Sequence, residues 1–396
     1  MKNPILFSLV FGLIITSCGQ KDLSLLNASE ESNLLASKLN SGSRAAFSTK
    51  NNQVGTLIPV ADMQTPRAAH TATRLNDGSV LICGGFEGSN TKRLSSAEIY
   101  DPASKSFTKT ARLTTPRIAH SSSLMSGGKV LIAGGYDGNA LSTTEIYDPE
   151  SKTFSKGPDL NTPRYGHTAT LLPDGKILIA GGVGPGWTFL SSVEIYDFQT
   201  NEFIPVKDMA LARESHTATL LKNGNVLITG GHRDRRENLK VYASAEIYDS
   251  KSNQFSPTGS MNIPRHKHDA VLLSDGKVLV NGGADKRDSP YASAEIYDPI
   301  TAQFTSISDM NYPRYKHQET SILLPDNTVL IGGGSDRAEV FNYKTAKFTP
   351  IQGNLGTTRL FSRATQLDNG EVLITGSYDD RIIARSESWL FAKHKP

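Results

Sequence analysis

The stretch that decides the fold is PRYGHTATLLPDGKILIAGG, residues 163–182. It predicts a short strand from His167 to Leu172, a turn at Pro173-Asp174-Gly175 and an apolar strand from Ile177 to Ala180. Asp-Gly between two strand-like segments is typical of a β-hairpin, and it predicts a type I′ turn with positive φ at both central residues. The double glycine Gly181-Gly182 then ends the second strand, because glycine adopts left-handed backbone angles without a steric penalty.

Two more strands complete the unit. A third is predicted from Val193 to Tyr196 and a fourth from Phe203 to Val206, after which the pattern begins again at Arg213. The unit is therefore a four-stranded antiparallel sheet, and the chain repeats it.

Seven copies of the unit follow one another, and the arginines that open them are 45 to 52 residues apart: Arg67, Arg117, Arg164, Arg213, Arg265, Arg314 and Arg359. Three positions after each arginine stands a histidine, except in the last copy, which has Ser362: His70, His120, His167, His216, His268 and His317. Each third strand begins with a glutamate: Glu98, Glu145, Glu194, Glu246, Glu295, Glu339 and Glu387. Such a period of 45 to 52 residues is typical of a propeller or another repeat architecture.

The ends of the chain predict how the ring closes. The segment 57–63, LIPVADM, matches the fourth-strand segment 203–209, FIPVKDM, but it precedes the first copy. The seventh copy lacks a fourth strand. We therefore expect the N-terminal strand to complete the last sheet, which leaves no open sheet edge.

The repeated residues carry a family resemblance. Pro-Arg-x-x-His, the double glycine and the later aromatic resemble kelch repeats over residues 57–391. The variant with HTATLLPDGK and EIYDP is similar to the propeller domain of galactose oxidase-like bacterial proteins. The resemblance implies an all-β fold, a seven-bladed kelch-type β-propeller over residues 57–396. It implies no single activity, because propellers host many unrelated functions.

The N-terminus predicts export. Lys2 precedes the apolar run Ile5–Ile15, which is too short to span a bilayer but fits the core of a signal peptide. The run ends in Ile-Thr-Ser-Cys, which resembles a bacterial lipobox and predicts lipidation of Cys18. The alternative is an ordinary cleaved signal with an accidental cysteine. The prediction divides the chain into a signal peptide (1–17), a lipidated cysteine and flexible tether (18–56) and the propeller, anchored in the bacterial cell envelope at the outer membrane or cell surface.

Composition excludes several functions. A formal net charge of +3 is too small to indicate binding to nucleic acid or electrostatic docking to a membrane. Membrane contact is therefore expected through the lipid alone.

Cys83 occupies a position where other copies have small residues, so we interpret it as a packing residue. No spacing resembles a zinc motif, and neither a metal nor another cofactor is predicted. The expected state is a monomer.

The residues common to all copies are predicted to be structural. Each arginine stands just before a first strand and each glutamate just before a third strand, at the same end of the sheet. We expect them to form ion pairs within each blade, because a single binding site does not need seven equivalent pairs. The repeated histidines are interpreted in the same way, as hydrogen-bonded residues of the first strand.

Functional residues are expected where the repeat varies. The loops after the double glycines differ in length, and they lie on the face where each first strand begins, here called the loop face. The longest, 232–243, has four basic and two acidic residues, and the loop 183–190 has two aromatic residues beside glycine and proline. The entrances of the first strands also differ: copies one and two have alanine and isoleucine, whereas copies four to six have polar residues. The sixth copy has two extra residues, which predict a bulge near 317–319. The candidate ligand-binding residues are Glu214, His266, Lys267, Tyr315, Lys316, Glu319, Arg233, Arg236 and Trp187. Neutral drift at an exposed surface is the alternative explanation.

These residues predict a binding module for a glycan, a peptide or an envelope protein, with an acidic ligand favoured by the basic loop. The alternative is a sugar-modifying enzyme similar to the kelch-type sialic acid mutarotase. Such an enzyme needs an acid–base pair, which Glu214, His266 or Glu319 could provide. A galactose oxidase-like copper enzyme is a weaker alternative, because Cys83 lies in an inner strand where it cannot serve as the cross-linked cysteine. No residue is assigned a catalytic role.

Overall fold

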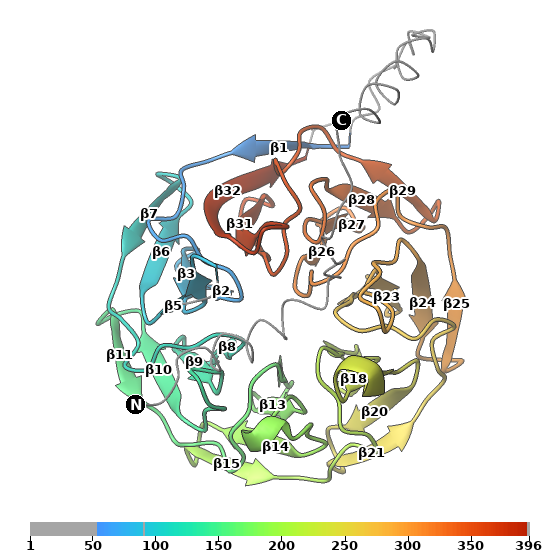
Figure 1. The fold of residues 1–396 in the computed structure, drawn as a ribbon, viewed down its shortest axis with the longest axis horizontal. Coiled ribbons are helices and arrows are strands. Elements are labelled where there is room, and N and C mark those ends of the chain that lie inside the picture. The colour runs from blue at the N-terminus through green and yellow to red at the C-terminus, as the bar shows by residue number, and fades with distance from the viewer. Residues whose placement is uncertain (1–53, 90–91, 394–396) are drawn as a thin grey trace, which may run out of the picture. The chain divides into compact units, whose positions relative to one another are not determined.

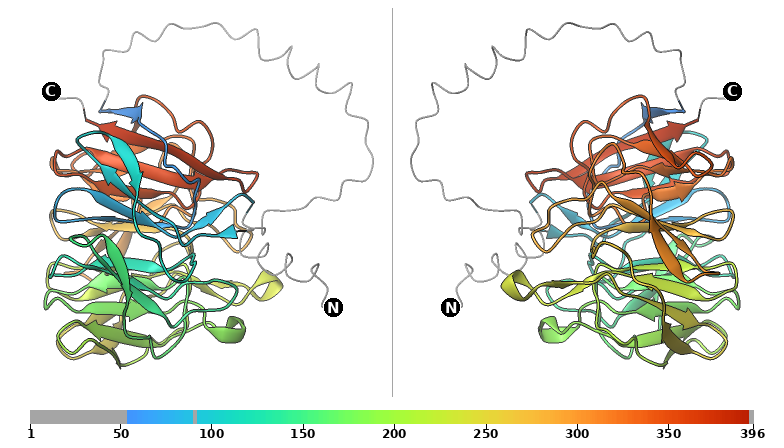
Figure 2. Two further views of the ribbon diagram at one scale, coloured as in Figure 1. Left: turned by 90° about the vertical axis from the view of Figure 1, so that its left-hand side faces the viewer. Right: turned by 90° about the vertical axis from the view of Figure 1, so that its right-hand side faces the viewer.

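The computed structural model describes residues 54–89 and 92–393, so Cys18, the signal peptide and most of the tether lie outside the described residues. Seven four-stranded antiparallel sheets surround a central axis (Figure 1). The side views show the sheets as the blades of one disc-like ring (Figure 2). Among the described residues, no helix is long and apolar enough to cross a membrane. The predicted all-β, seven-bladed propeller is confirmed.

The first strand of each blade lies innermost, and the following strands succeed one another outward. The first strands are β2 (Thr71–Arg74), β8 (Ser121–Leu124), β12 (Thr168–Leu171), β16 (Thr217–Leu220), β22 (Asp269–Leu272), β26 (Ser321–Leu323) and β30 (Arg363–Gln366). The second strands are β3 (Val80–Cys83), β9 (Val130–Ala133), β13 (Ile177–Ala180), β17 (Val226–Thr229), β23 (Val278–Asn281), β27 (Thr328–Ile331) and β31 (Val372–Tyr378). All residues of the second strands are buried. They read as continuous apolar runs because both of their faces are covered by neighbouring blades.

The outer half of each blade contains a third and a fourth strand. The third strands are β6 (Ala97–Asp101), β10 (Thr144–Asp148), β14 (Val193–Asp197), β20 (Ala245–Asp249), β24 (Ala294–Asp298), β28 (Glu339–Asn342) and β32 (Ala384–Ala392). The fourth strands are β7 (Ser106–Lys109), β11 (Thr153–Lys156), β15 (Glu202–Pro205), β21 (Gln254–Pro257), β25 (Gln303–Ser306), β29 (Lys347–Pro350) and, in blade seven, β1 (Thr56–Pro59). The loops add β4 (Phe86–Glu87), β5 (Lys92–Arg93), β18 (His232–Arg233), β19 (Lys240–Val241) and the 3₁₀ turns η1 (Pro185–Trp187) and η2 (Arg236–Asn238).

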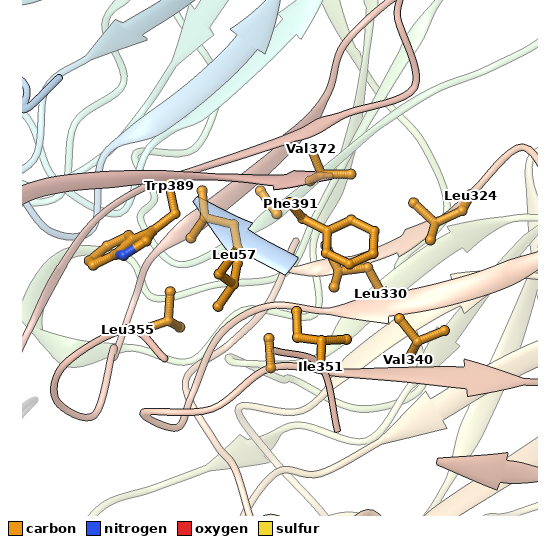
Figure 3. Close-up of a cluster of buried hydrophobic side chains, with 12 residues drawn as sticks. Leu57, Leu324, Leu330, Val340, Ile351, Leu355, Val372, Trp389 and Phe391 are labelled. Carbon is orange, nitrogen blue, oxygen red and sulfur yellow. The ribbon is translucent and has the colours of Figure 1, made fainter. Parts of the chain in front are cut away.

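The N-terminal strand closes the ring, as predicted. β1 pairs antiparallel with β32, so that Leu57 lies opposite Phe391 and Pro59 opposite Trp389. Leu57 is buried in an apolar cluster with Trp389, Phe391 and Leu355 (Figure 3). Because the first and last strands of the described chain share one sheet, blade seven has four strands like the other six.

The hairpin at Pro173-Asp174-Gly175 differs from the expected type I′ turn. Only Gly175 has a positive φ, +86°. A type I′ turn centred on Asp174-Gly175 would also need a positive φ at Asp174, and a turn without proline, Asn76-Asp77-Gly78, shows the same pattern, with a positive φ at Gly78 alone. The backbone N–H of Leu172 donates to the oxygen of Lys176 at 2.8 Å, and that of Gly175 donates to Leu172 at 2.9 Å. The turn is therefore a three-residue connection with a left-handed glycine at its end, a common alternative hairpin.

The repeated arginines and glutamates form ion pairs that are buried in blades one to six, which confirms their structural role, whereas Glu387 of blade seven is 39% exposed. In blade three, Nη2 of Arg164 lies 2.8 Å from Oε1 of Glu194, and Nη1 donates to the oxygens of Gly181 and Ser192. Glu194 also accepts the backbone N–H of Thr162 at 3.0 Å. The equivalent pairs are Arg67–Glu98, Arg117–Glu145, Arg213–Glu246, Arg265–Glu295, Arg314–Glu339 and Arg359–Glu387. In blades one to six, the arginine at the entrance of the first strand therefore binds both a backbone oxygen of the double glycine and the glutamate of the third strand.

The repeated histidines link neighbouring blades. Nε2 of His216 lies 3.0 Å from Oγ1 of Thr168 in the preceding blade, and Nε2 of His70 lies 3.1 Å from Oγ1 of Thr375 across the closing junction. Burial and the adjacent Arg213 lower the pKa of His216 to about 3. These histidines are therefore neutral at pH 7, which fits the predicted structural role.

Candidate functional site

One residue of every blade, two positions after the repeated arginine, has a left-handed backbone. These seven residues, with φ between 49° and 62°, are called the axial ring: Ala69, Ala119, Gly166, Ser215, Lys267, Lys316 and Phe361. Backbone hydrogen bonds join six of the seven neighbouring pairs, for example from Lys316 N to Lys267 O at 2.8 Å and from Phe361 N to Lys316 O at 2.7 Å. A left-handed residue other than glycine costs about 1 kcal/mol, so this conformation is held by the ring as a whole.

The axial ring is chemically one-sided. Blades one to four contribute alanine, glycine or serine, whereas blades five and six contribute Lys267 and Lys316. Lys267 is 8% exposed and Lys316 is 2% exposed. Burying a cation is costly unless it is paired, so the partners of these two side chains define the site.

Acidic and aromatic side chains from the loop face surround the two lysines. Nζ of Lys267 lies 2.6 Å from Oδ1 of Asp288, and Nζ of Lys316 donates to the hydroxyl of Tyr378 at 2.8 Å. The Lys316 ammonium also lies 4.9 Å from the ring centre of Tyr315. Burial, and then the charge of Lys316, lower the pKa of Lys267. The two ammonium groups therefore influence each other electrostatically.

A chain of carboxylates and imidazoles adjoins Lys267. Oε2 of Glu214 lies 3.0 Å from Nε2 of His232, and Nδ1 of His232 lies 3.1 Å from Nδ1 of His266. Nε2 of His266 lies 3.3 Å from Oδ1 of Asp288, the carboxylate that also binds Lys267. The chain crosses from blade four to blade five, and all five side chains are nearly buried. We call these five residues the polar chain.

The pKa values of the polar chain follow from burial and from mutual charge. Burial alone would raise the pKa of Glu214, but His232, Arg235 and Lys267 outweigh it, and the pKa falls to about 2. Burial and Lys267 lower the pKa of His266 to about 4, against the opposing effect of Asp288. Burial opposes ionisation of Asp288 as well, but His266 and Lys267 hold the pKa of its carboxyl well below the usual range. Both carboxylates are therefore ionised at neutral pH.

A register rule places His232 opposite Glu214. The residue after the double glycine forms a β-bridge with the residue after the repeated arginine, as in Glu214–His232 and His266–Ala284. In blade one the same bridge joins Ala68 and Phe86. The entrances and the loops after the double glycines therefore share the loop face, as predicted.

An aromatic group lies beside Glu214. The guanidinium of Arg235 lies 4.4 Å from the ring centre of Trp187 and 5.4 Å from that of Phe189. Trp187 packs edge-on against Tyr165, with ring centres 6.2 Å apart, and has a left-handed backbone with φ of 65°. A bulky residue in this conformation is uncommon, and such strain often occurs at ligand sites. The ring of Phe189 packs edge-on against that of His232, with ring centres 5.6 Å apart.

The two extra residues of blade six form a turn at Gln318–Glu319, before β26, so the predicted β-bulge is wrong in kind although its place is right. Asp269 of blade five holds the turn, because its carboxylate accepts the backbone N–H groups of Glu319, Thr320 and Ser321 at 2.7–3.1 Å. Burial raises the pKa of Asp269 to about 6 despite these bonds. The side chain of Glu319 is 71% exposed and binds Arg363 of blade seven.

The structure brings together four of the predicted candidates. Glu214, His266 and Lys267 belong to the polar chain, and Lys316 lies next to this chain. Tyr315 packs on Lys316, and Trp187 belongs to the neighbouring aromatic group. Three candidates lie elsewhere or are not described. Glu319 faces blade seven, Arg233 is half-exposed and pairs with Asp234, and the side chain of Arg236 is outside the described part of the chain.

Four residues that were not on the candidate list complete the site: His232, Asp288, Arg235 and Tyr378. His232 and Tyr378 directly follow a double-glycine position, so the register rule would have found them. Asp288 and Arg235 lie further along irregular loops, where no repeat pattern predicts a position.

One solved structure similar in fold is described as a novel fungal alcohol oxidase with catalytic diversity among the AA5 family, in complex with copper. The match covers 86% of this chain and 76% of that chain, with a TM-score of 0.69 and 17% sequence identity. At this identity the likeness concerns the fold alone. Among curated proteins, none matches this chain.

The residues of this chain do not fit a copper centre of that kind. Within the described residues, no group of three or more His, Cys, Asp or Glu side chains converges as metal ligands. Cys83 is buried in β3, where Sγ lies 3.3 Å from Oγ1 of Thr71, and burial raises the pKa of its thiol to about 11. This environment fits the predicted packing role, and we derive no reaction step through copper.

The repeats themselves match family models. The kelch motif matches residues 67–114 and 117–161, which are blades one and two. The KLHDC2/KLHL20/DRC7 kelch-repeats domain matches residues 156–334, from the end of blade two to blade six. Together with the seven four-stranded blades and their buried Arg–Glu pairs, these matches confirm the resemblance inferred from the sequence. The chain is a kelch-repeat protein whose repeats form a seven-bladed β-propeller.

Proposed function

We propose that this propeller is a binding module that takes an acidic ligand on its loop face, with Lys267 and Lys316 as the anchoring cations. The observation that carries the proposal is which residue types stand at the seven positions of the axial ring. Five blades adopt the same left-handed backbone without a basic side chain, so the fold does not require the two lysines. Buried charges that a fold does not require are characteristic of functional sites.

The charges of the site support an anionic ligand. Arg235, Lys267 and Lys316 supply three cations, against the carboxylates of Glu214 and Asp288. The excess of cations in a site shielded from water strengthens attraction to an acidic group, because screening by solvent is weaker there. A carboxylate of the ligand would bind the ammonium groups of blades five and six.

The aromatic group indicates which acidic ligands fit. Trp187 and Phe189 are half-buried, so each presents part of its ring. Aromatic faces beside polar groups suit sugar rings and aromatic or aliphatic peptide side chains. An acidic sugar is the preferred ligand and an acidic peptide segment the second, with the ring of the sugar near Trp187 and its carboxylate toward Lys267.

Export and lipid anchoring are part of the proposal. They are supported by the apolar run Ile5–Ile15 and by Cys18 at its end. Mass spectrometry of the mature protein from its host would test them: a lipidated N-terminal Cys18 is expected, and Cys18→Ser should leave the propeller in the soluble fraction. A mature N-terminus at another residue would contradict the anchor.

A second candidate, a sugar-modifying acid–base enzyme, is favoured by the polar chain. Glu214, His232 and His266 are hydrogen-bonded in series beside the proposed sugar site, which is what acid–base catalysis needs. Anomer exchange of N-acetylneuraminate, followed by NMR with and without the protein, would detect this activity. An unchanged exchange rate would leave binding as the function.

A ligand panel tests the proposed function. Calorimetric titration of the protein with D-glucuronate, N-acetylneuraminate, a glutamate-rich peptide and D-glucose should give binding for acidic members and none for glucose. Raising the salt concentration from 20 to 300 mM should weaken the binding, because screening reduces charge attraction. Equal binding of glucose and glucuronate, unaffected by salt, would contradict an anionic site.

A further inference from the structure

The two histidines of the polar chain face each other through the same type of ring nitrogen. Nδ1 of His232 and Nδ1 of His266 are 3.1 Å apart, and the ring centres are 4.7 Å apart at an angle of 78°. On its other side, Nε2 of His232 lies 3.0 Å from Oε2 of Glu214. Nε2 of His266 lies 3.1 Å from the backbone oxygen of Asp285 and 3.3 Å from Oδ1 of Asp288. Each ring nitrogen of the pair therefore has at least one polar neighbour.

Proton counting decides the state of this pair. An ionised carboxylate and a backbone carbonyl can only accept hydrogen bonds, so both Nε2 atoms must carry protons. A neutral imidazole has a single ring proton, which leaves both Nδ1 atoms as acceptors facing each other. Two lone pairs 3.1 Å apart repel in a buried environment. A hydrogen bond between the rings therefore needs a third proton, which makes one ring an imidazolium.

The surroundings indicate which ring holds the extra proton. His266 adjoins the ammonium of Lys267, and burial together with this neighbour lowers its pKa. His232 adjoins the carboxylate of Glu214, whose pKa is held at about 2 by His232, Arg235 and Lys267 against the effect of burial. The extra proton is thus better placed on Nδ1 of His232, from which it is donated to Nδ1 of His266.

We propose that His232 is a buried imidazolium hydrogen-bonded to His266 and that it couples the binding of an acidic ligand to proton uptake. The coupling rests on the proposed function of the Lys267–Lys316 site, whereas the protonation state does not. The imidazolium adds a further cation to a site that already has Arg235 and the two lysines. Loss of its proton should therefore weaken the binding of an anion.

Other charged and titratable groups also face the pair and are part of the balance. The groups that contact one of the two rings or act on it electrostatically are Glu214, Asp288, Lys267, His216 and His268, whereas Arg235, Tyr165 and Lys316 act in turn on Glu214 or Lys267. Burial lowers the pKa of both His216 and His268, so these two stay neutral.

Nitrogen NMR on the full-length protein, labelled with ¹⁵N-histidine and without ligand, tests the protonation state. At pH 6 to 7, we expect one histidine with both ring nitrogens protonated and a ¹⁵N–¹⁵N coupling across the bond to a second ring. His232→Gln should remove both signatures. A spectrum in which every histidine is neutral at pH 6, with no coupling between rings, would overturn the proposal whatever the ligand.

Calorimetry with D-glucuronate and N-acetylneuraminate tests the coupling. In buffers with different ionisation enthalpies, binding should take up a fraction of a proton, and the affinity should fall by about tenfold as the pH rises through the titration seen by NMR. His232→Gln should abolish the proton uptake, whereas Arg233→Gln, a half-exposed cation in the same strand, should retain it. Binding that is independent of pH would overturn the coupling. Absence of any binding, with the NMR signature present, would overturn the coupling and the proposed function together and leave the protonation state standing.

Discussion

Nζ of Lys267 lies 2.6 Å from Oδ1 of Asp288, and both side chains are nearly buried. The same carboxylate lies 3.3 Å from Nε2 of His266. A single loop residue therefore neutralises an axial-ring lysine and positions one of the paired histidines. The same loop also places the backbone oxygen of Asp285 3.1 Å from Nε2 of His266, so it contacts both His266 and Lys267.

Replacement of Asp288 tests the importance of this contact for stability. Asp288→Asn leaves the buried Lys267 without its carboxylate, which should lower the free energy of unfolding by about 3 kcal/mol. Adding Lys267→Met should recover part of this loss, since the two residues are coupled. Urea unfolding measures both effects. Asp298→Asn, which removes the partly exposed partner of Lys277, should have little effect on stability, and a similar loss in both variants would contradict a special role for Asp288.

The repeated Arg–Glu pairs differ in burial, and this difference predicts a difference in stability. Arg164→Ala leaves the buried Glu194 unpaired and should cost about 3 to 5 kcal/mol. In blade seven, Arg359 lies 3.4 Å from Glu387, which is 39% exposed, so Arg359→Ala should cost clearly less. Thermal unfolding compares the two. An unchanged melting temperature for Arg164→Ala, together with loss of ligand binding, would reverse the structural assignment.

Closure of the ring by β1 predicts unequal effects at adjacent residues. Leu57 is 4% exposed within the cluster of Figure 3, whereas Ile58, the next residue, is 42% exposed. Leu57→Ala should cost about 2 to 5 kcal/mol through the cavity it leaves, and Ile58→Ala less than about 1 kcal/mol. Denaturant unfolding of the two variants measures this. Equal costs would argue against β1 as the strand that completes blade seven.

Most of the fold could be predicted from sequence because each structural residue recurs. The repeated arginine and glutamate, such as Arg164 and Glu194, stand at the same end of the blade in every copy. Their pairing therefore follows from the order of the strands. The match between residues 57–63 and 203–209 likewise predicts β1, since a ring requires the missing strand. The type I′ turn was wrong because the Asp-Gly pattern also fits a three-residue hairpin in which the glycine alone has a positive φ, and this turn recurs in blades with and without proline, as at Gly175 and Gly78.

The site was predicted only in part, for a physical reason. The repeat predicts where the entrance of each first strand lies. Polar residues that depart from the repeat there could therefore be recognised from the sequence: Glu214, His266, Lys267 and Lys316. Asp288 and Arg235 occupy irregular loops, in which the repeat assigns no position. No spacing along the chain encodes the conformations of these loops, so the contacts of Asp288 with Lys267 and of Arg235 with Trp187 emerge only in three dimensions.

The depressed pKa of Glu214 predicts a pH-dependent contribution to stability. Its folded pKa of about 2 lies below the unfolded value of 4.5, so the contribution is complete above about pH 4.5 and is lost as the pH falls toward 2. The stability difference between the protein and Glu214→Gln should therefore shrink by about 2 kcal/mol between pH 7 and pH 3. Urea unfolding at the two pH values measures it. A difference that stays constant between the two pH values would contradict the pairing of Glu214 with His232.

The central claim is that an acidic ligand binds the axial-ring lysines. The most direct test is calorimetric titration of Lys267→Ala and Lys316→Ala with the acidic sugar that the protein binds most tightly, beside Lys277→Ala as the control. Lys277 has the same charge but lies in a turn on the opposite face, paired with Asp298. We predict at least about a tenfold loss of affinity in each axial-ring variant and unchanged affinity in the control. Lys267→Ala also leaves the buried Asp288 unpaired, so its melting temperature should fall, and the titrations are made well below the unfolding transition of every variant. Unchanged affinity in both axial-ring variants, or an equal loss in Lys277→Ala, would contradict the account.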